Sequence, residues 1–270
     1  FIEYVKFSST EKLMKDDPAV HTYSLMPYQV RATTPKRLYV YQHGTQRRPA
    51  EGAWAAISFF PATLLTWWEA WVENFEPLLH PETDIRVTGS PWHDYLSKSR
   101  DSSPPDWDIL FIGGSQATTH SEKWEKLYEE LVADLVRACE NNGWSLVIKL
   151  HPIESSDWYR EHGWESYVVE FESIRDALNN VDLAVTHYSS AFVESIAVGT
   201  PIILSEEWSY GLSELRPIAG AKFADSDELE QEIKRVRQSD LDADSIIKNN
   251  QLLDIGGSVD QILDTILDDS

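Results

Sequence analysis

The chain has 270 residues, 42% of them hydrophobic, and a formal net charge of −22 from 45 acidic against 23 basic side chains. That length and apolar content suit one large globular domain or two of ordinary size. The negative charge argues against nucleic acid as a partner, because its phosphates would be repelled, and no apolar run approaches the roughly 20 residues that cross a bilayer. Acidic residues are spread along the whole chain, which favours a halophilic source.

The single cysteine, Cys139, excludes an internal disulfide framework and any cysteine-based metal cluster. It occupies an apolar position of a predicted helix, so we expect a buried thiol and a reducing, cytoplasmic location. The sequence begins at Phe1 and its opening has no start-like character. We therefore expect further sequence upstream and an N-terminal domain that is cut short.

The first hundred residues alternate between strand and helix patterns. A strand that enters a polar turn is predicted over 37–46, a strand and a helix over 61–79, and a strand followed by Gly-Ser-Pro over 84–96. Residues 97–106, "SKSRDSSPPD", are polar and rich in proline, as linkers are. The sequence thus predicts a partial α/β unit over residues 1–100 and a second unit over residues 101–270.

The second unit repeats this alternation more regularly. Near-continuous apolar runs predict strands, and periodic stretches between them predict helices. Such runs are typical of a parallel sheet that is covered on both faces. The predicted strands are 106–115, 145–152, 166–171, 182–187 and 201–206, and the predicted helices are 119–143, 173–181 and 190–198, with terminal helices within 241–269 that pack on the same unit.

Polar clusters follow four of the predicted strands. They are Gly113-Gly114-Ser115, Lys149 to Pro152, His187 to Ser190 and, in the first unit, Gln42 to Thr45. Ligands of an open parallel sheet bind beyond the carboxyl ends of its strands. The coincidence of the four clusters at such ends predicts the site.

Ser189 and Ser190 stand where a strand passes into a helix. One hydroxyl can cap the helix, and the other, beside free main-chain amides, would suit a phosphate. Glu194 lies one turn inside the same helix, where a carboxylate can accept both hydroxyls of a ribose or simply be solvated.

Two histidines stand at strand ends. His151 can hydrogen-bond a phosphate oxygen as a neutral imidazole, or offset leaving-group charge as a cation. If the two units face each other across a cleft, His43 can act from the other side as a base, and Gly44 permits close approach of a ligand. No His, Asp or Glu grouping has a metal-ligand spacing, so we expect no metal.

Four segments, "VYQHGT", "DIRVTGSPWHDYL", "SLVIKLHP" and "DLAVTHYSSAFVESIAVGTPIIL", resemble in order and spacing the CDP-glycerol glycerophosphotransferase and capsule-polysaccharide transferase families. Bacterial sialyltransferases of similar fold also carry His-Pro and Ser-Ser motifs, used on CMP-linked donors. The resemblance implies the glycosyltransferase B fold, in which two Rossmann-like domains face a cleft.

The resemblance also implies roles for individual residues. His151, Ser189 and Ser190 would contact the donor phosphates, Glu194 would reach the ribose, and His43 would face the acceptor as base or charge partner. Gly114, Ser115 and Lys149 complete the expected nucleotide and phosphate site.

The chain departs from the glycerophosphotransferases at two places. They typically show Asp-Tyr-Ser-Ser where this chain has His187-Tyr188-Ser189-Ser190, and the arginine often found before His-Pro is absent, with Lys149 the nearest cation. These departures leave the identity of the donor open.

We therefore expect a metal-independent transferase without a cofactor. It would move a glycosyl or polyol-phosphate group from a nucleotide-activated donor to a surface-polysaccharide or lipid-linked acceptor, in the cytoplasm or peripherally at the inner face of the membrane. Two alternatives stay open: an enzyme like the UDP-sugar 2-epimerases, and a non-catalytic subunit that binds nucleotide-sugars.

Overall fold

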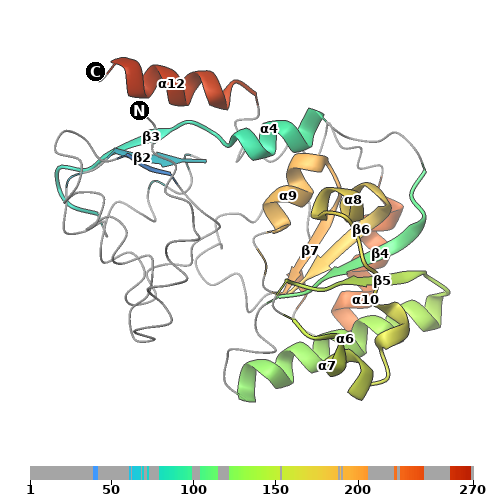
Figure 1. Ribbon diagram of the computed structural model, residues 1–270. Coiled ribbons are helices and arrows are strands. Elements are labelled where there is room, and N and C mark those ends of the chain that lie inside the picture. Colours follow the sequence, from blue (N-terminus) through green and yellow to red (C-terminus); the bar gives the residue numbers. More distant parts are fainter. Residues whose placement is uncertain are drawn as a thin grey trace. The chain divides into compact units, whose positions relative to one another are not determined.

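The computed structural model describes residues 39–41, 61, 63–67, 69, 72, 79–98, 104–114, 122–152, 154–187, 189, 191–205, 222–223, 226–239 and 256–268 (Figure 1). The chain divides into two compact units, one of residues 1–90 with 258–270 and the other of residues 91–257. The domain boundaries predicted from the sequence, 1–100 and 101–270, stay predictions.

The first unit contains a parallel sheet in the order β1-β2-β3. The buried β2 side chains Leu64 and Leu65 supply its apolar character. Its strands are β1 (Tyr39–Tyr41), β2 (Thr63–Thr66) and β3 (Asp84–Val87).

The C-terminal helix α12 (Ser258–Asp268) groups with the first unit. We expected the terminal helices to pack on the second unit, and for α12 that expectation is wrong. Gly256 and Gly257 precede the helix with φ values of 108° and 83°, a conformation open to glycine, so the chain can turn sharply there.

The second unit is built on a five-stranded parallel sheet in the order β5-β4-β6-β7-β8. Two of the three inner strands, β4 and β6, carry apolar side chains buried on both faces, as parallel strands covered on both sides require. The strands are β4 (Trp107–Ile112), β5 (Leu146–Lys149), β6 (Val181–Thr186), β7 (Ile202–Ser205) and β8 (Lys222–Phe223).

Helices cover the two faces of this sheet as separate layers (Figure 1). On one face lie α6 (Glu122–Asn142), α7 (Ser156–Glu161) and α10 (Ser226–Gln238), and on the other lie α8 (Ile174–Asn179) and α9 (Ala191–Val198). α6 buries one stripe at three- and four-residue spacing, whereas seven of the eight α9 residues are buried. α9 is enclosed because it packs on the sheet, on α8 and on α4 (Pro91–Lys98).

Two segments differ from the sequence-based expectation. The helix α4 was not predicted, because its buried side chains include the polar His93 and Asp94 and so hide the apolar period. The strand predicted over 166–171 is also wrong. A 3₁₀ turn takes up Glu165–Tyr167, and only Val168 then forms a bridge with β5, at Ile148.

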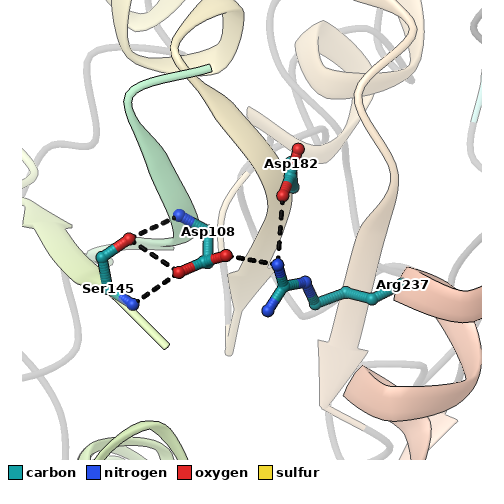
Figure 2. Close-up of polar contacts among 4 residues, drawn as sticks. All are labelled: Asp108, Ser145, Asp182 and Arg237. Carbon is teal, nitrogen blue, oxygen red and sulfur yellow. Dashed lines mark hydrogen bonds and ion pairs between the residues drawn. The ribbon is translucent and has the colours of Figure 1, made fainter. Parts of the chain in front are cut away.

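An ion-pair cluster joins α10 to the amino edge of the sheet (Figure 2). Asp108 and Asp182 stand side by side near the starts of β4 and β6, and Arg237 bonds to both, at 3.2 Å from Asp182. The Asp108 carboxylate also accepts hydrogen bonds from the Ser145 amide at 2.7 Å and its hydroxyl at 2.8 Å. Burial tends to raise the pKa of Asp108, but the bonds from Ser145 and the charge of Arg237 outweigh it and lower that pKa.

Replacing Arg237 by methionine should lower the free energy of unfolding by about 1–2 kcal/mol, because two neighbouring carboxylates lose their shared cation. The difference from wild type should begin to shrink near pH 4 and disappear only as the pH falls through the lowered pKa of Asp108, since protonated Asp108 no longer gains from the cation. Urea denaturation at pH 7 gives the loss in the free energy of unfolding, and a series from pH 4 down to pH 2 shows whether the difference shrinks as Asp108 is protonated. Arg235→Met, on the same helix but in an exposed pair with Glu232, should cost no more than about 0.5 kcal/mol; equal losses for the two variants would contradict the assignment.

Candidate functional site

The candidate site lies at the carboxyl edge of the second sheet, where the strand order reverses. The chain leaves β4 for β5 on one side, while β6 continues to β7 on the other. The connections after β4 and β6 therefore diverge to opposite faces, and such switch points are where open α/β sheets bind ligands. The Thr186 hydroxyl donates to the Ile112 carbonyl at 2.9 Å and ties these two strand ends together.

The turn after β4 approaches the turn after β5 closely. Gly113 donates its amide to the Lys149 carbonyl at 2.9 Å. A Cβ atom on Gly113 would lie 2.0 Å from Oε2 of Glu154 and 3.1 Å from the main-chain nitrogen of His151. A side chain at position 113 would therefore displace the Glu154 carboxylate from its place beside the His151 amide, which accounts for the first glycine of the Gly-Gly pair.

Gly114, which the sequence assigned to phosphate binding, lies buried at this junction. Its amide donates to the Tyr128 hydroxyl at 3.4 Å, so this donor is turned toward the protein interior. Ser115, the next residue of that cluster, lies outside the described residues.

The His-Pro turn is closed by a side chain that we did not single out. The Glu154 amide donates to the His151 carbonyl at 2.9 Å, and the Glu154 carboxylate accepts from the His151 amide at 2.7 Å. Burial raises the pKa of that carboxyl, and its hydrogen bonds offset only part of the rise. The four-residue span "HPIE" was the available sequence signal, because a turn after Pro152 returns residue 154 to residue 151.

His151 and Lys149 stand on the β5 side of this edge. Both side chains are partly exposed. Burial lowers the pKa of His151, and the positive charge of Lys149 lowers it further. The neutral imidazole is therefore the prevailing form at pH 7, which favours a hydrogen-bonding role over a cationic one.

Ser189 performs the capping role that the sequence offered for one of the two serines. Its hydroxyl accepts from the Ala191 amide at 3.2 Å, and its carbonyl accepts from the Phe192 amide at 3.4 Å. Ser190 lies outside the described residues. Gly199, with φ of 83°, ends the helix, and its amide bonds back to Ser195 at 3.0 Å.

Glu194 lies in the first turn of α9 and receives a hydrogen bond that spacing could not have shown. The indole Nε1–H of Trp92 donates to its Oε1 at 2.9 Å, from a helix 102 residues earlier in the chain. Burial raises the pKa of Glu194, while the Trp92 bond and the charge of Lys149 lower it in part. Trp92 is itself 44% exposed.

The structure thus places five of the predicted site residues at one edge of the second sheet: Gly114, Lys149, His151, Ser189 and Glu194. The positive charge of Lys149 acts to lower the pKa of both His151 and Glu194. The carboxyl end of β5 and the first turn of α9 therefore interact electrostatically. His43 lies outside the described residues, so its predicted place opposite His151 stays a prediction.

The described residues contain no group of three or more His, Cys, Asp or Glu side chains arranged to hold a metal ion. Within the same ranges, no helix combines the length and the apolar character needed to cross a bilayer.

The chain is similar in structure to several solved enzymes. A variant of the wall teichoic acid polymerase TagF matches with a TM-score of 0.55 and 15% identity, over 86% of this chain and 67% of the other. The UDP-GlcNAc 2-epimerase of Methanocaldococcus jannaschii, in complex with UDP-GlcNAc and UDP, matches with a TM-score of 0.64 and 12% identity. The match covers 97% of this chain and 81% of the epimerase chain. Sucrose-phosphate synthase of Thermosynechococcus elongatus matches with a TM-score of 0.56 and 14% identity. The match covers 99% of this chain and 79% of the synthase chain.

No protein-family model and no curated protein matches the chain. At 12–15% identity the three structural likenesses bear on the fold. They agree with the two parallel α/β units and with the switch-point order of the second sheet. The chain therefore has the glycosyltransferase B fold that its motifs predicted.

Proposed function

We propose that the chain is a transferase that moves a glycosyl or polyol-phosphate group from a nucleotide-activated donor to a surface-polysaccharide or lipid-linked acceptor. One observation carries the proposal: Lys149, His151, Ser189 and Glu194 lie together at the carboxyl edge of the second sheet, at its switch point. TagF, one of the structural neighbours, is a wall teichoic acid polymerase.

Each of these groups suits one part of a nucleotide donor. Lys149 and the N-terminus of α9 supply positive potential for the phosphates, and a neutral His151 can donate a hydrogen bond to a phosphate oxygen. Glu194 has one oxygen bonded to Trp92, and its carboxylate can accept from ribose hydroxyls. His43 and Ser190 would complete the site from the acceptor side and beside Ser189.

We propose that the departing phosphate is stabilised without a metal or a cofactor. The cationic Lys149 and the α9 amides can carry the developing charge. The enzyme would then act in the cytoplasm, and a lipid-linked acceptor would bring it to the inner face of the membrane.

The proposal is tested by nucleotide binding in excess chelator. CMP, CDP, UMP, UDP and GDP are added in turn at high salt, and the melting temperature is followed, since a ligand of the native state raises it. At least one nucleotide should raise it, and chelator should not abolish the shift. Glu194→Gln should weaken that binding by about tenfold, whereas Glu161→Gln, an exposed position on α7, should leave it unchanged. No shift with any nucleotide would contradict the proposal.

A second candidate is an epimerase acting on a UDP-sugar, which the similarity to the UDP-GlcNAc 2-epimerase favours. Product analysis separates the two. An epimerase converts the sugar nucleotide with no acceptor present, whereas a transferase consumes it only with an acceptor. Binding without either reaction would indicate a non-catalytic subunit.

A further inference from the structure

A carboxyl group and two tyrosines form a hydrogen-bonded cluster beneath the candidate site. The Tyr128 hydroxyl, from α6, donates to Oε1 of Glu154 at 2.7 Å and lies 2.7 Å from the hydroxyl of Tyr159, from α7. Tyr159 also lies 3.4 Å from the same carboxylate oxygen. Both tyrosines are fully buried, so the cluster is held on the protein side of the edge.

The cluster connects two of the turns that carry the site, the one after β4 and the one after β5. Oε2 of Glu154 accepts from the His151 amide at 2.7 Å, and the Gly114 amide donates to Tyr128 at 3.4 Å. Since a phenol oxygen can donate once and accept twice, Tyr128 can donate to Glu154 while it accepts from Tyr159 and from Gly114. The hydrogen bonds of the cluster are then mutually consistent, as a rigid polar network requires.

The spacing of the two turns depends on this carboxylate. The Glu154 carboxylate fills the place that a side chain on Gly113 would occupy, with its Oε2 2.0 Å from that Cβ position. A shift of Glu154 would release the His151 amide and would open the space beneath Gly113. The main chain at both turns would then be free to move.

We propose that Glu154 is a positioning residue that sets the place of His151 relative to the turn after β4 without touching the donor. This inference rests on the proposed function for the meaning of that placement. It predicts that the shape and hydrogen bonds of residue 154 matter more than its charge. A glutamine can reproduce the bonds: its oxygen accepts from the His151 amide, and its amide donates to Tyr128, which can turn its hydroxyl toward Tyr159.

Three variants test the proposal: Glu154→Ala, Glu154→Gln and, as a control on the exposed face of α7, Glu161→Ala. Turnover is measured against donor concentration at a temperature where each variant is folded. Glu154→Ala should raise KM for the donor and lower kcat, with a combined loss of about 10- to 100-fold. Glu154→Gln should recover kcat/KM to within about threefold of wild type, and Glu161→Ala should match wild type.

Two outcomes would overturn the proposal. One is folded Glu154→Ala protein with wild-type kcat and KM. The other is Glu154→Gln protein that is folded yet as impaired as Glu154→Ala, which would show that the charge is what matters.

A readout without any ligand keeps this test separate from the proposed function. The amide of His151 should be protected from hydrogen exchange in wild type and in Glu154→Gln, and unprotected in Glu154→Ala. If wild type binds no nucleotide, the proposed function fails while this pattern still decides the positioning role. Equal protection in all three proteins would overturn that role.

Discussion

Replacing Gly113 by alanine is expected to lower the free energy of unfolding by about 2–4 kcal/mol. The added Cβ would lie 2.0 Å from Oε2 of Glu154, so the carboxylate must leave and give up its bond to the His151 amide. Gly113 is not among the positive-φ glycines of the described residues. Alanine therefore meets no backbone strain there, and the loss reports the overlap together with the hydrogen bond that it breaks. Urea denaturation of wild type and variant gives the difference.

A double-mutant cycle identifies the group responsible. In Glu154→Ala protein the overlapping carboxylate is gone, so Gly113→Ala should cost less there by about 1–2 kcal/mol. The remaining approach, 3.1 Å to the His151 nitrogen, should leave a smaller residual cost. Strict additivity of the two substitutions would contradict the close packing of the two turns.

Replacing His151 by alanine is expected to lower kcat/KM for the donor by about 10²- to 10³-fold, the usual cost of losing one donor to developing phosphate charge. Burial and the Lys149 charge keep the pKa of this imidazole below its ordinary value. The group is then neutral at pH 7 and at pH 8.5, so the loss should be the same at both. Initial rates at the two pH values measure it.

His80, which accepts the Glu82 amide at 3.1 Å in a turn of the first unit, supplies a control. His80→Ala should keep turnover within about twofold of wild type. A contribution of His151 that falls about tenfold per pH unit would show a cationic role instead, and an unimpaired His151→Ala enzyme would remove His151 from the reaction.

Much of the fold was predictable because the burial of parallel strands leaves continuous apolar runs, as in β4 and β6. The helix α4 could not be predicted, because Asp94 is buried by a contact with a distant part of the chain. Its carboxylate accepts a hydrogen bond from the Gly256 amide at 2.6 Å, 162 residues away. The segment 166–171 has strand-forming residues, yet it finds only one bridge on the edge of β5. Propensity cannot show how much of a segment will meet a partner strand.

The candidate site was predictable as far as strand ends can locate it. Lys149 ends its strand, and His151, Ser189 and Glu194 follow strands whose carboxyl ends must share an edge with it. Trp92 could not be inferred, since its bond to Glu194 depends on how α4 and α9 pack. Glu154 could have been inferred from the turn that the sequence "HPIE" allows. Only the structure shows that its carboxylate accepts a hydrogen bond from Tyr128.

The most direct test of the account is an amide chemical-shift map of the isotopically labelled protein during titration with the nucleotide that raises its melting temperature. We predict that the amides of Gly113, His151 and Ala191, all at the carboxyl edge of the second sheet, shift together and saturate. Those of Asp108 and Asp182, at the opposite edge (Figure 2), should stay in place. Saturable shifts centred on Asp108 and Asp182, with the carboxyl edge unmoved, would contradict the account.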